Sequence, residues 1–129
     1  MTLTIENYTS HRQKTTRLRE YLKTANPDEL ILFTDGYDTI LLAGESEILA
    51  KYHRLSPTGK ILMSADRINA SGPQYPELFK PTLHSYNYLC SGGFIGKAGA
   101  ILEAIDVITE VIRNDHSGEN KDYRWCDQY

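Results

Sequence analysis

The feature that most constrains the fold is an apolar run that ends abruptly in two acidic residues, Ile31-Leu-Phe-Thr-Asp-Gly-Tyr-Asp-Thr-Ile-Leu41. The short segment 29–34, with its continuous apolar centre, predicts a strand that is buried on both faces. Asp35 and Asp38 follow this strand, at the point where the chain is expected to turn. In an open α/β sheet, ligands collect beyond the carboxyl ends of the strands. Carboxylates there are hard oxygen ligands for Mg²⁺ or Mn²⁺, ions that can bridge a protein to a diphosphate.

The same residues allow other interpretations of this acidic turn. Asp and Gly are common in turns, so both acids can be ordinary turn residues, although a turn requires neither the second acid nor an aromatic residue between them. An aspartyl-phosphate enzyme would have its two acids two positions apart, whereas Asp35 and Asp38 are three apart. Tyr37 between the acids can stack on a nucleobase, an interaction worth roughly 1–3 kcal/mol, or it can fill a gap in the surface.

Length and charge narrow the class of protein. A chain of 129 residues can form one domain with one modest core, which we place over 1–129. Its 14 basic and 17 acidic side chains give a formal charge of −3, which disfavours general binding of nucleic acid. Cys90 and Cys126 form no metal-type pair, and free thiols are favoured over a disulfide, which stays open. A homo-oligomer also stays open.

The same sequence lacks the signals of a membrane or secreted protein. No apolar run approaches the roughly 20 residues that span a bilayer. The first residues, Met1-Thr-Leu-Thr-Ile-Glu-Asn-Tyr-Thr, lack the charged and apolar regions of a secretion signal. As written, the sequence predicts a soluble, cytoplasmic protein.

Hydrophobic spacing and turn residues predict an alternation of helices and strands. Helices are expected over 10–24, over about 45–55 and over 97–113. Strands are expected over 29–34, 60–65 and 88–96, with a short extended piece over 39–42. Long loops are expected over 67–87 and 115–123, and a further element is expected to begin at 125–129. This alternation predicts an α/β fold with a mostly parallel sheet and flanking helices.

Several segments of the chain carry a more specific signal when they are taken together and in order. They are Arg12-Gln-Lys14, Phe33-Thr-Asp-Gly-Tyr-Asp38, Ile61-Leu-Met-Ser-Ala-Asp66, Tyr75-Pro-Glu77, Tyr88-Leu-Cys-Ser-Gly-Gly-Phe-Ile-Gly96 and Asp127-Gln. In order and spacing they resemble the glycosyltransferase domain of procollagen lysyl hydroxylases and related collagen galactosyl- and glucosyltransferases. The acidic turn, the Ser-Gly-Gly-Phe-Ile-Gly stretch and the late Asp-Gln pair carry most of this resemblance.

The resemblance implies a GT-A-type fold that uses Mn²⁺ (or Mg²⁺) and UDP-galactose or UDP-glucose. It implies transfer of the sugar to a hydroxyl acceptor, on a collagen-like hydroxylysine or a glycan. By the same resemblance, Asp35 and Asp38 would hold the metal and Tyr37 would stack on uracil. The metal would act as a Lewis acid that neutralises charge on the UDP leaving group.

The resemblance also assigns residues around the donor sugar. Ser91, Gly92 and Gly93 match a family loop beside that sugar, where glycine lets the backbone approach a ligand closely. A strand bulge or tight bend explains the same tripeptide equally well. Lys14 matches a position near the diphosphate, although a solvated lysine on a helix face is the alternative.

Two further acids are candidates for catalysis. Asp66 and Asp127 match positions that would bind sugar hydroxyls or act as an acid or base. For Asp66, a helix cap or a loop role is the alternative. The family's first strand lies before the start of this sequence and its third metal ligand, a histidine, lies beyond the end, so we expect an incomplete GT-A core. The alternative function is therefore a non-catalytic remnant that binds a nucleotide sugar.

Overall fold

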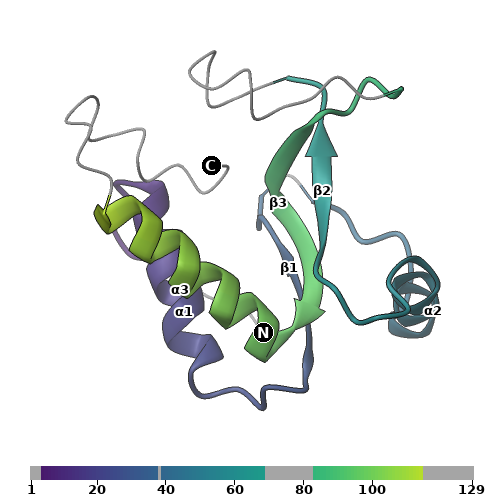
Figure 1. Cartoon of the computed structure of the whole chain (residues 1–129), viewed down its shortest axis with the longest axis horizontal. Coiled ribbons are helices and arrows are strands. Elements are labelled where there is room, and N and C mark those ends of the chain that lie inside the picture. Colours follow the sequence, from purple (N-terminus) through teal and green to yellow (C-terminus); the bar gives the residue numbers. More distant parts are fainter. Residues whose placement is uncertain (1–3, 38, 69–82, 115–129) are drawn as a thin grey trace.

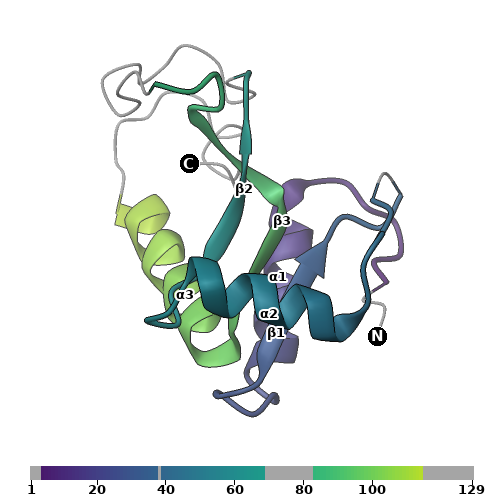
Figure 2. The ribbon, with the colours of Figure 1, turned by 90° about the vertical axis from the view of Figure 1, so that its right-hand side faces the viewer.

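The structure, a computed structural model, describes residues 4–37, 39–68 and 83–114. Helices and strands alternate over most of this range, close to the positions expected from the sequence. In chain order they are α1 (His11–Leu22), β1 (Leu30–Thr34), α2 (Glu45–Leu55), β2 (Leu62–Asp66), β3 (Tyr88–Lys97) and α3 (Ala98–Asn114). The two long helices α1 and α3 lie side by side against one face of the sheet, and α2 lies on the opposite side (Figures 1 and 2).

The sheet has the order β1-β3-β2, and both outer strands run antiparallel to β3. The prediction of a mostly parallel sheet is therefore wrong for the described strands, while the mixture of helix and sheet is confirmed. The helix α2 connects β1 to β2, and these two strands do run in the same direction. They are not neighbours, however, because β3 lies between them in the opposite direction. Residues 39–42, expected to be extended, are not a strand of this sheet.

The core lies between α1, α3 and the sheet. Its buried side chains are Leu18, Leu22, Ala98, Ile101 and Ile105, and the partly buried Phe33 and Phe94 pack against them from the sheet. The two phenylalanine rings are stacked, with their centroids 4.8 Å apart. Fully burying a leucine or isoleucine side chain contributes about 1.5–3 kcal/mol, so this small cluster supplies much of the driving force for folding.

The start of α1 is fixed by a side chain from its own first turn. The Gln13 Oε1 atom accepts hydrogen bonds from the backbone N–H groups of Thr9, at 2.6 Å, and Ser10, at 3.2 Å. A side chain that reaches back in this way satisfies donors that the helix leaves free at its N-terminus. The helix therefore begins at a defined residue, which sets the direction in which the next residue, Lys14, leaves it.

The side of the sheet that carries α2 is less well covered. The only described buried residue of α2 is Tyr52, whose hydroxyl donates to the Lys60 carbonyl at 3.3 Å. Several leucine and isoleucine side chains of β1, α2 and the segment between them are exposed, namely Leu32, Ile40, Leu41, Leu42 and Leu55. None of the helices in the described ranges is both long and apolar enough to cross a membrane.

We expect Gly96→Ala to destabilise the fold, because β3 passes close to the chain just before β2. Gly96 is buried, and a Cβ there would lie 2.9 Å from Ile61 Cγ1 and 3.2 Å from Ile61 Cα. Overpacking of this kind costs roughly 1–3 kcal/mol of unfolding free energy, measurable by urea denaturation. Gly36→Ala is the matched control, since nothing described lies within 4 Å of its Cβ position. Equal stability of the two variants would contradict this account of Gly96.

Candidate functional site

The acidic turn lies directly against the Ser-Gly-Gly stretch of β3. Thr34, the last residue of β1, is opposite Gly93. The next residue continues the pairing, because the Asp35 N–H donates to the Gly92 carbonyl at 2.9 Å. The strand pairing therefore brings together two of the segments that the sequence singled out, although they are far apart along the chain.

On its other side, β3 makes an irregular pairing with β2. Met63 is opposite Phe94, but the next residue, Ser64, is opposite Cys90. Residues 91–93 of β3 thus have no opposite residue in β2, and the Ser-Gly-Gly stretch forms a bulge. The bulge that the sequence offered as an alternative is confirmed, and bulges commonly lie next to functional sites because they redirect the chain.

The two glycines of this bulge leave room for a polar side chain from each neighbouring strand. A Cβ on Gly92 would lie 3.1 Å from Asp35 Oδ2, and a Cβ on Gly93 would lie 2.6 Å from Ser64 Oγ. Ser91 itself is buried. A side chain at either position would displace one of these polar groups, and the bulge places backbone next to the Asp35 carboxylate.

Lys14 reaches this carboxylate from α1. Its Nζ atom lies 3.4 Å from Asp35 Oδ1, and 5.8 Å from the centroid of the Phe33 ring. The Lys14 side chain is only 19% exposed, against 40% for Asp35. Lys14 is thus not a solvated residue on the helix surface but part of the site, held by a carboxylate and beside an aromatic ring.

Tyr37 has no such packing. Its side chain is fully exposed, so it fills no gap in the described surface. The ring lies two residues after Asp35 in the turn and is free of burial by the protein on either face. An aromatic ring in this situation can stack on a planar ligand.

Asp66 ends β2 at the same end of the sheet as Asp35, because β1 and β2 run in the same direction. Its Oδ1 atom accepts hydrogen bonds from the backbone N–H groups of Arg67, at 2.6 Å, and Ile68, at 3.3 Å. This is the loop role that the sequence left open for Asp66. Asp38 and Asp127, the other acids expected at the site, lie outside the described residues.

The structure adds Ser64 and Cys90, for which the sequence suggested no role. Ser64 contacts the position of Gly93, and the Cys90 thiol lies 3.6 Å from the Cβ position of Gly92. Cys90 is a free, half-buried thiol. Both residues belong to segments that the resemblance had picked out. Their place beside the glycines depends on the register of β2 with β3 on either side of the bulge, which the sequence does not specify.

We next asked whether these residues fit a divalent cation. Asp35 supplies hard carboxylate oxygens, and Gly92 leaves the space beside Oδ2 without a side chain. Within the ranges that the structure covers, no three His, Cys, Asp or Glu side chains are grouped as metal ligands. Mg²⁺ is commonly bound by only one or two carboxylates together with water and substrate phosphates. The Asp35 donor fits a cation that is shared with a diphosphate.

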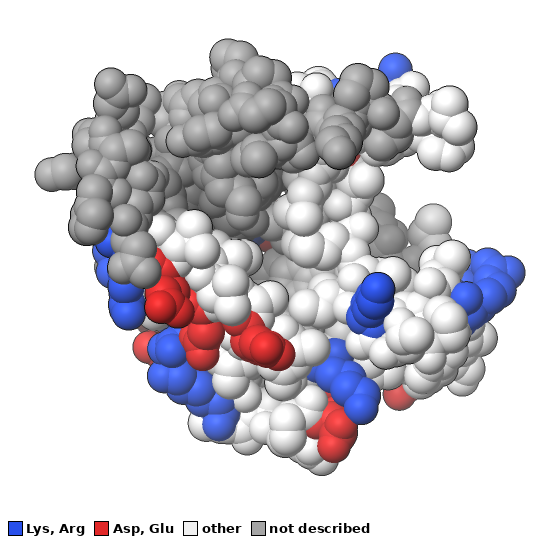
Figure 3. All heavy atoms as spheres, viewed as in Figure 1, with Lys and Arg blue, Asp and Glu red and all other residues white. Residues whose placement is uncertain are grey.

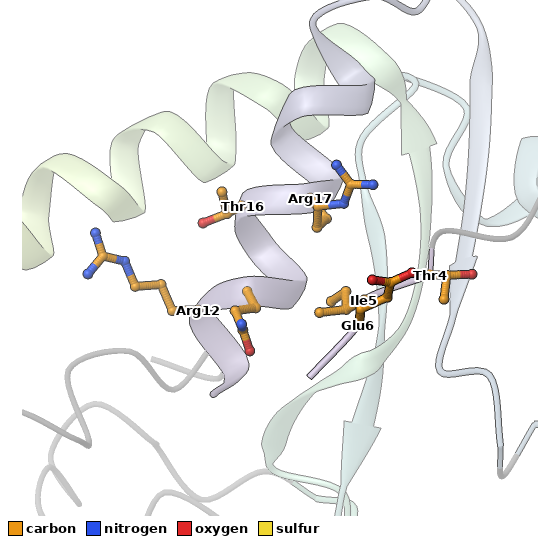
Figure 4. A pocket seen from close by; sticks show the side chains of 7 residues that line it. Thr4, Ile5, Glu6, Arg12, Thr16 and Arg17 are labelled. Carbon is orange, nitrogen blue, oxygen red and sulfur yellow. The ribbon is translucent and has the colours of Figure 1, made fainter. Parts of the chain in front are cut away.

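A separate pocket of about 700 Å³ lies between the N-terminal segment and α1 (Figure 4). It is lined by Thr4, Ile5, Glu6, Arg12, Gln13, Thr16 and Arg17. Figure 4 shows the Arg12 and Arg17 side chains pointing in different directions, and Arg17 forms an ion pair with Glu20 at 3.0 Å. On the face shown in Figure 3, basic and acidic side chains are interspersed rather than gathered into a basic patch.

Comparison with known proteins finds one family over most of the chain. Residues 4–119 match the family described as the PLOD GT domain. An uncharacterized protein of Acanthamoeba polyphaga mimivirus is 33% identical over 101 residues, which are 78% of this chain and 22% of that protein. Procollagen-lysine,2-oxoglutarate 5-dioxygenase 1 of Gallus gallus is 28% identical over 96 residues, 73% of this chain and 13% of the relative.

A second dioxygenase gives a similar match. Procollagen-lysine,2-oxoglutarate 5-dioxygenase 2 of Mus musculus is 33% identical over 89 residues, 67% of this chain and 12% of the relative. The chain thus spans less than a quarter of the length of each of these relatives.

Proposed function

The chain belongs to the PLOD GT domain family, and from this premise we propose that it binds a UDP-sugar through a divalent cation and transfers galactose or glucose to a hydroxyl acceptor. The family supports a glycosyltransferase-type role in general. The cation, the donor and the acceptor are our proposal. The acceptor would be a collagen-like hydroxylysine or a glycan hydroxyl, by analogy with the relatives named for procollagen lysine.

The observation that carries this proposal is the position of Asp35. Its carboxylate lies at the end of β1, against the Gly92 backbone and within 3.4 Å of the Lys14 ammonium. Asp35, together with Asp38 as predicted from the sequence, would hold Mn²⁺ or Mg²⁺, which when bound neutralises charge on the UDP leaving group. Lys14 can balance a further phosphate charge, and the exposed ring of Tyr37 can stack on the uracil.

The glycines and serines would then contact the sugar. Gly92 and Gly93 carry no side chain of their own, so a ligand can approach their backbone closely beside Asp35 and Ser64. Ser64 supplies a hydroxyl next to Gly93, and hydroxyl groups donate and accept hydrogen bonds with sugars. In our proposal, Asp66 and Asp127 stay candidates for binding sugar hydroxyls or for proton transfer.

A second candidate is a domain that binds a nucleotide sugar without transferring it. One contact favours it, because the Asp66 Oδ1 atom is bound by the backbone of its own turn. A carboxylate held in this way is poorly placed to accept a proton from an acceptor hydroxyl, since a general base must reach that proton. The two candidates share the cation and nucleotide site and differ only in the chemistry.

We expect UDP and Mn²⁺ together to raise the melting temperature of the chain, and each alone to raise it less. A ligand at a hundred times its dissociation constant adds about 2.7 kcal/mol to the unfolding free energy. Thermal melting with UDP, UDP-glucose and UDP-galactose measures this, with ADP and Mn²⁺ as the control for base selectivity. The absence of any shift with UDP and Mn²⁺ would contradict both candidates, while a shift without hydrolysis or transfer of the sugar would favour the binding domain.

A further inference from the structure

Resting on the proposed function, we infer that the Lys14 ammonium shares the Asp35 carboxylate in the ligand-free protein and so weakens the binding of a divalent cation, which then binds well only together with a diphosphate. Lys14 would be a positioning residue that couples the two ligands. The proposed function already has the cation and the nucleotide bind together, and the inference adds the residue that makes each depend on the other.

The first step is that the Lys14 ammonium is held in place. It lies 3.4 Å from Asp35 Oδ1 and 5.8 Å from the centroid of the Phe33 ring, and its side chain is largely buried. A cation over an aromatic face is attracted by the electrons of the ring. The helix start that Gln13 fixes places Lys14 at this position. An ammonium held by these contacts is a persistent neighbour of the carboxylate.

The second step is electrostatic. A divalent cation bound at Asp35 would lie close to this ammonium, and like charges at such a distance repel each other, most strongly where water is partly excluded. A bound cation therefore either displaces Lys14 from Asp35 or, if Lys14 stays in place, interacts more weakly with the Asp35 carboxylate. In both cases the affinity of the cation alone is lowered.

The third step is the effect of the nucleotide. A diphosphate brings negative charge that can interact with the cation and the ammonium at the same time, so the repulsion between them is relieved. The cation then increases the affinity of the nucleotide by the same factor by which the nucleotide increases the affinity of the cation. Lys14 thus keeps the occupancy of the Asp35 site by free cations low, while a cation and a diphosphate together bind tightly.

The chain offers a matched control pair in Lys97 and Asp28. Their Nζ and Oδ1 atoms lie 2.8 Å apart, and this pair also joins residues distant in the sequence. It is more exposed than the Lys14 pair and lies at the opposite end of β1. The hydrogen bond from Lys97 and its positive charge hold the pKa of the Asp28 carboxyl below its usual value. A change at Lys97 therefore removes a comparable ion pair without touching the candidate site.

The test measures Mn²⁺ binding by titration calorimetry on the whole 129-residue chain, with and without UDP. Lys14→Met keeps the unbranched side chain and removes the charge. We expect this variant to bind Mn²⁺ alone about tenfold more tightly than the unmodified chain does. The factor by which UDP raises the Mn²⁺ affinity is expected to fall by about the same tenfold, which lies within the usual range of coupling between sites. Lys97→Met is expected to change neither quantity, and Lys14→Arg, which keeps the charge, is expected to retain the coupling.

The outcomes separate the inference from the proposed function. If Asp35→Ala removes Mn²⁺ binding but Lys14→Met leaves both the affinity and the coupling unchanged, the inference is overturned and the metal site remains. If Lys14→Met weakens Mn²⁺ binding, the inference is also wrong. If no variant binds Mn²⁺ with or without UDP, both proposals fail. Lys14→Gln serves as a second charge-removing variant, and melting curves establish that each variant is folded.

Discussion

Asp35→Ala is expected to weaken the joint binding of UDP and Mn²⁺ by at least about a hundredfold. Residues that merely support a metal ligand already change affinity by roughly 10–100-fold when they are replaced, and Asp35 would be a ligand itself. The variant should still fold, because the hydrogen bond from residue 35 to the Gly92 carbonyl comes from the backbone and not from the carboxylate. Calorimetric titration of UDP in the presence of Mn²⁺ measures the change.

Asp28→Ala is the control for this substitution. Asp28 is also an acid next to β1 that pairs with a lysine, but it lies at the other end of the strand from Asp35. We expect its nucleotide affinity to equal that of the unmodified chain. An Asp35→Ala variant that binds UDP and Mn²⁺ as tightly as Asp28→Ala would remove the proposed role of the acidic turn.

Leu22→Ala is expected to cost about 2–5 kcal/mol of unfolding free energy, as large-to-small changes in well-packed cores do. Leu22 is only 3% exposed and belongs to the cluster between α1 and α3. A loss of this size is a large share of the roughly 5–15 kcal/mol that keeps a typical domain folded. Urea denaturation followed by circular dichroism gives the value.

The same substitution at Leu42 is the control, because that side chain is 93% exposed. Surface replacements away from special features usually change stability by less than about 0.5 kcal/mol. If both leucine variants lost the same stability, the core would not lie where the structure places it. A partner surface that covers residue 42 would then explain a loss of stability in the Leu42 variant.

The helices were the part of the fold that the sequence predicted best. Isoleucines at 101, 105, 108 and 112 predict a helix from about residue 97. Ile101 and Ile105 of this stripe are buried, whereas Ile108 is 36% exposed. Such a prediction succeeds because helical periodicity is a local property of the side chains. The direction of β3, in contrast, is not determined by the residues of that strand alone. It depends on which strand lies beside it, and alternation of elements along the chain does not fix that.

In the candidate site too, local segments could be predicted from the sequence, whereas contacts between distant residues could not. The acidic turn and the Ser-Gly-Gly stretch were identified from the sequence, because they occur in order with other segments that together resemble one family. Their mutual contact required the register of β1 with β3, and the contact of Lys14 with Asp35 required the packing of α1. The sequence left open whether Lys14 lies near the diphosphate or is a solvated lysine on a helix face, and the structure places it beside Asp35.

The stacked rings of Phe33 and Phe94 have a consequence beyond the interior that they help to fill. They are opposite each other across β1 and β3, and the acidic turn begins two residues after the first ring. Since side chains alternate between the faces of a strand, a slip of one residue would turn Phe33 outward and separate Asp35 from Gly92. The stacked apolar pair thus fixes the strand register that brings the polar groups together. A substitution that loosens this pair is expected to weaken ligand binding without changing any charge.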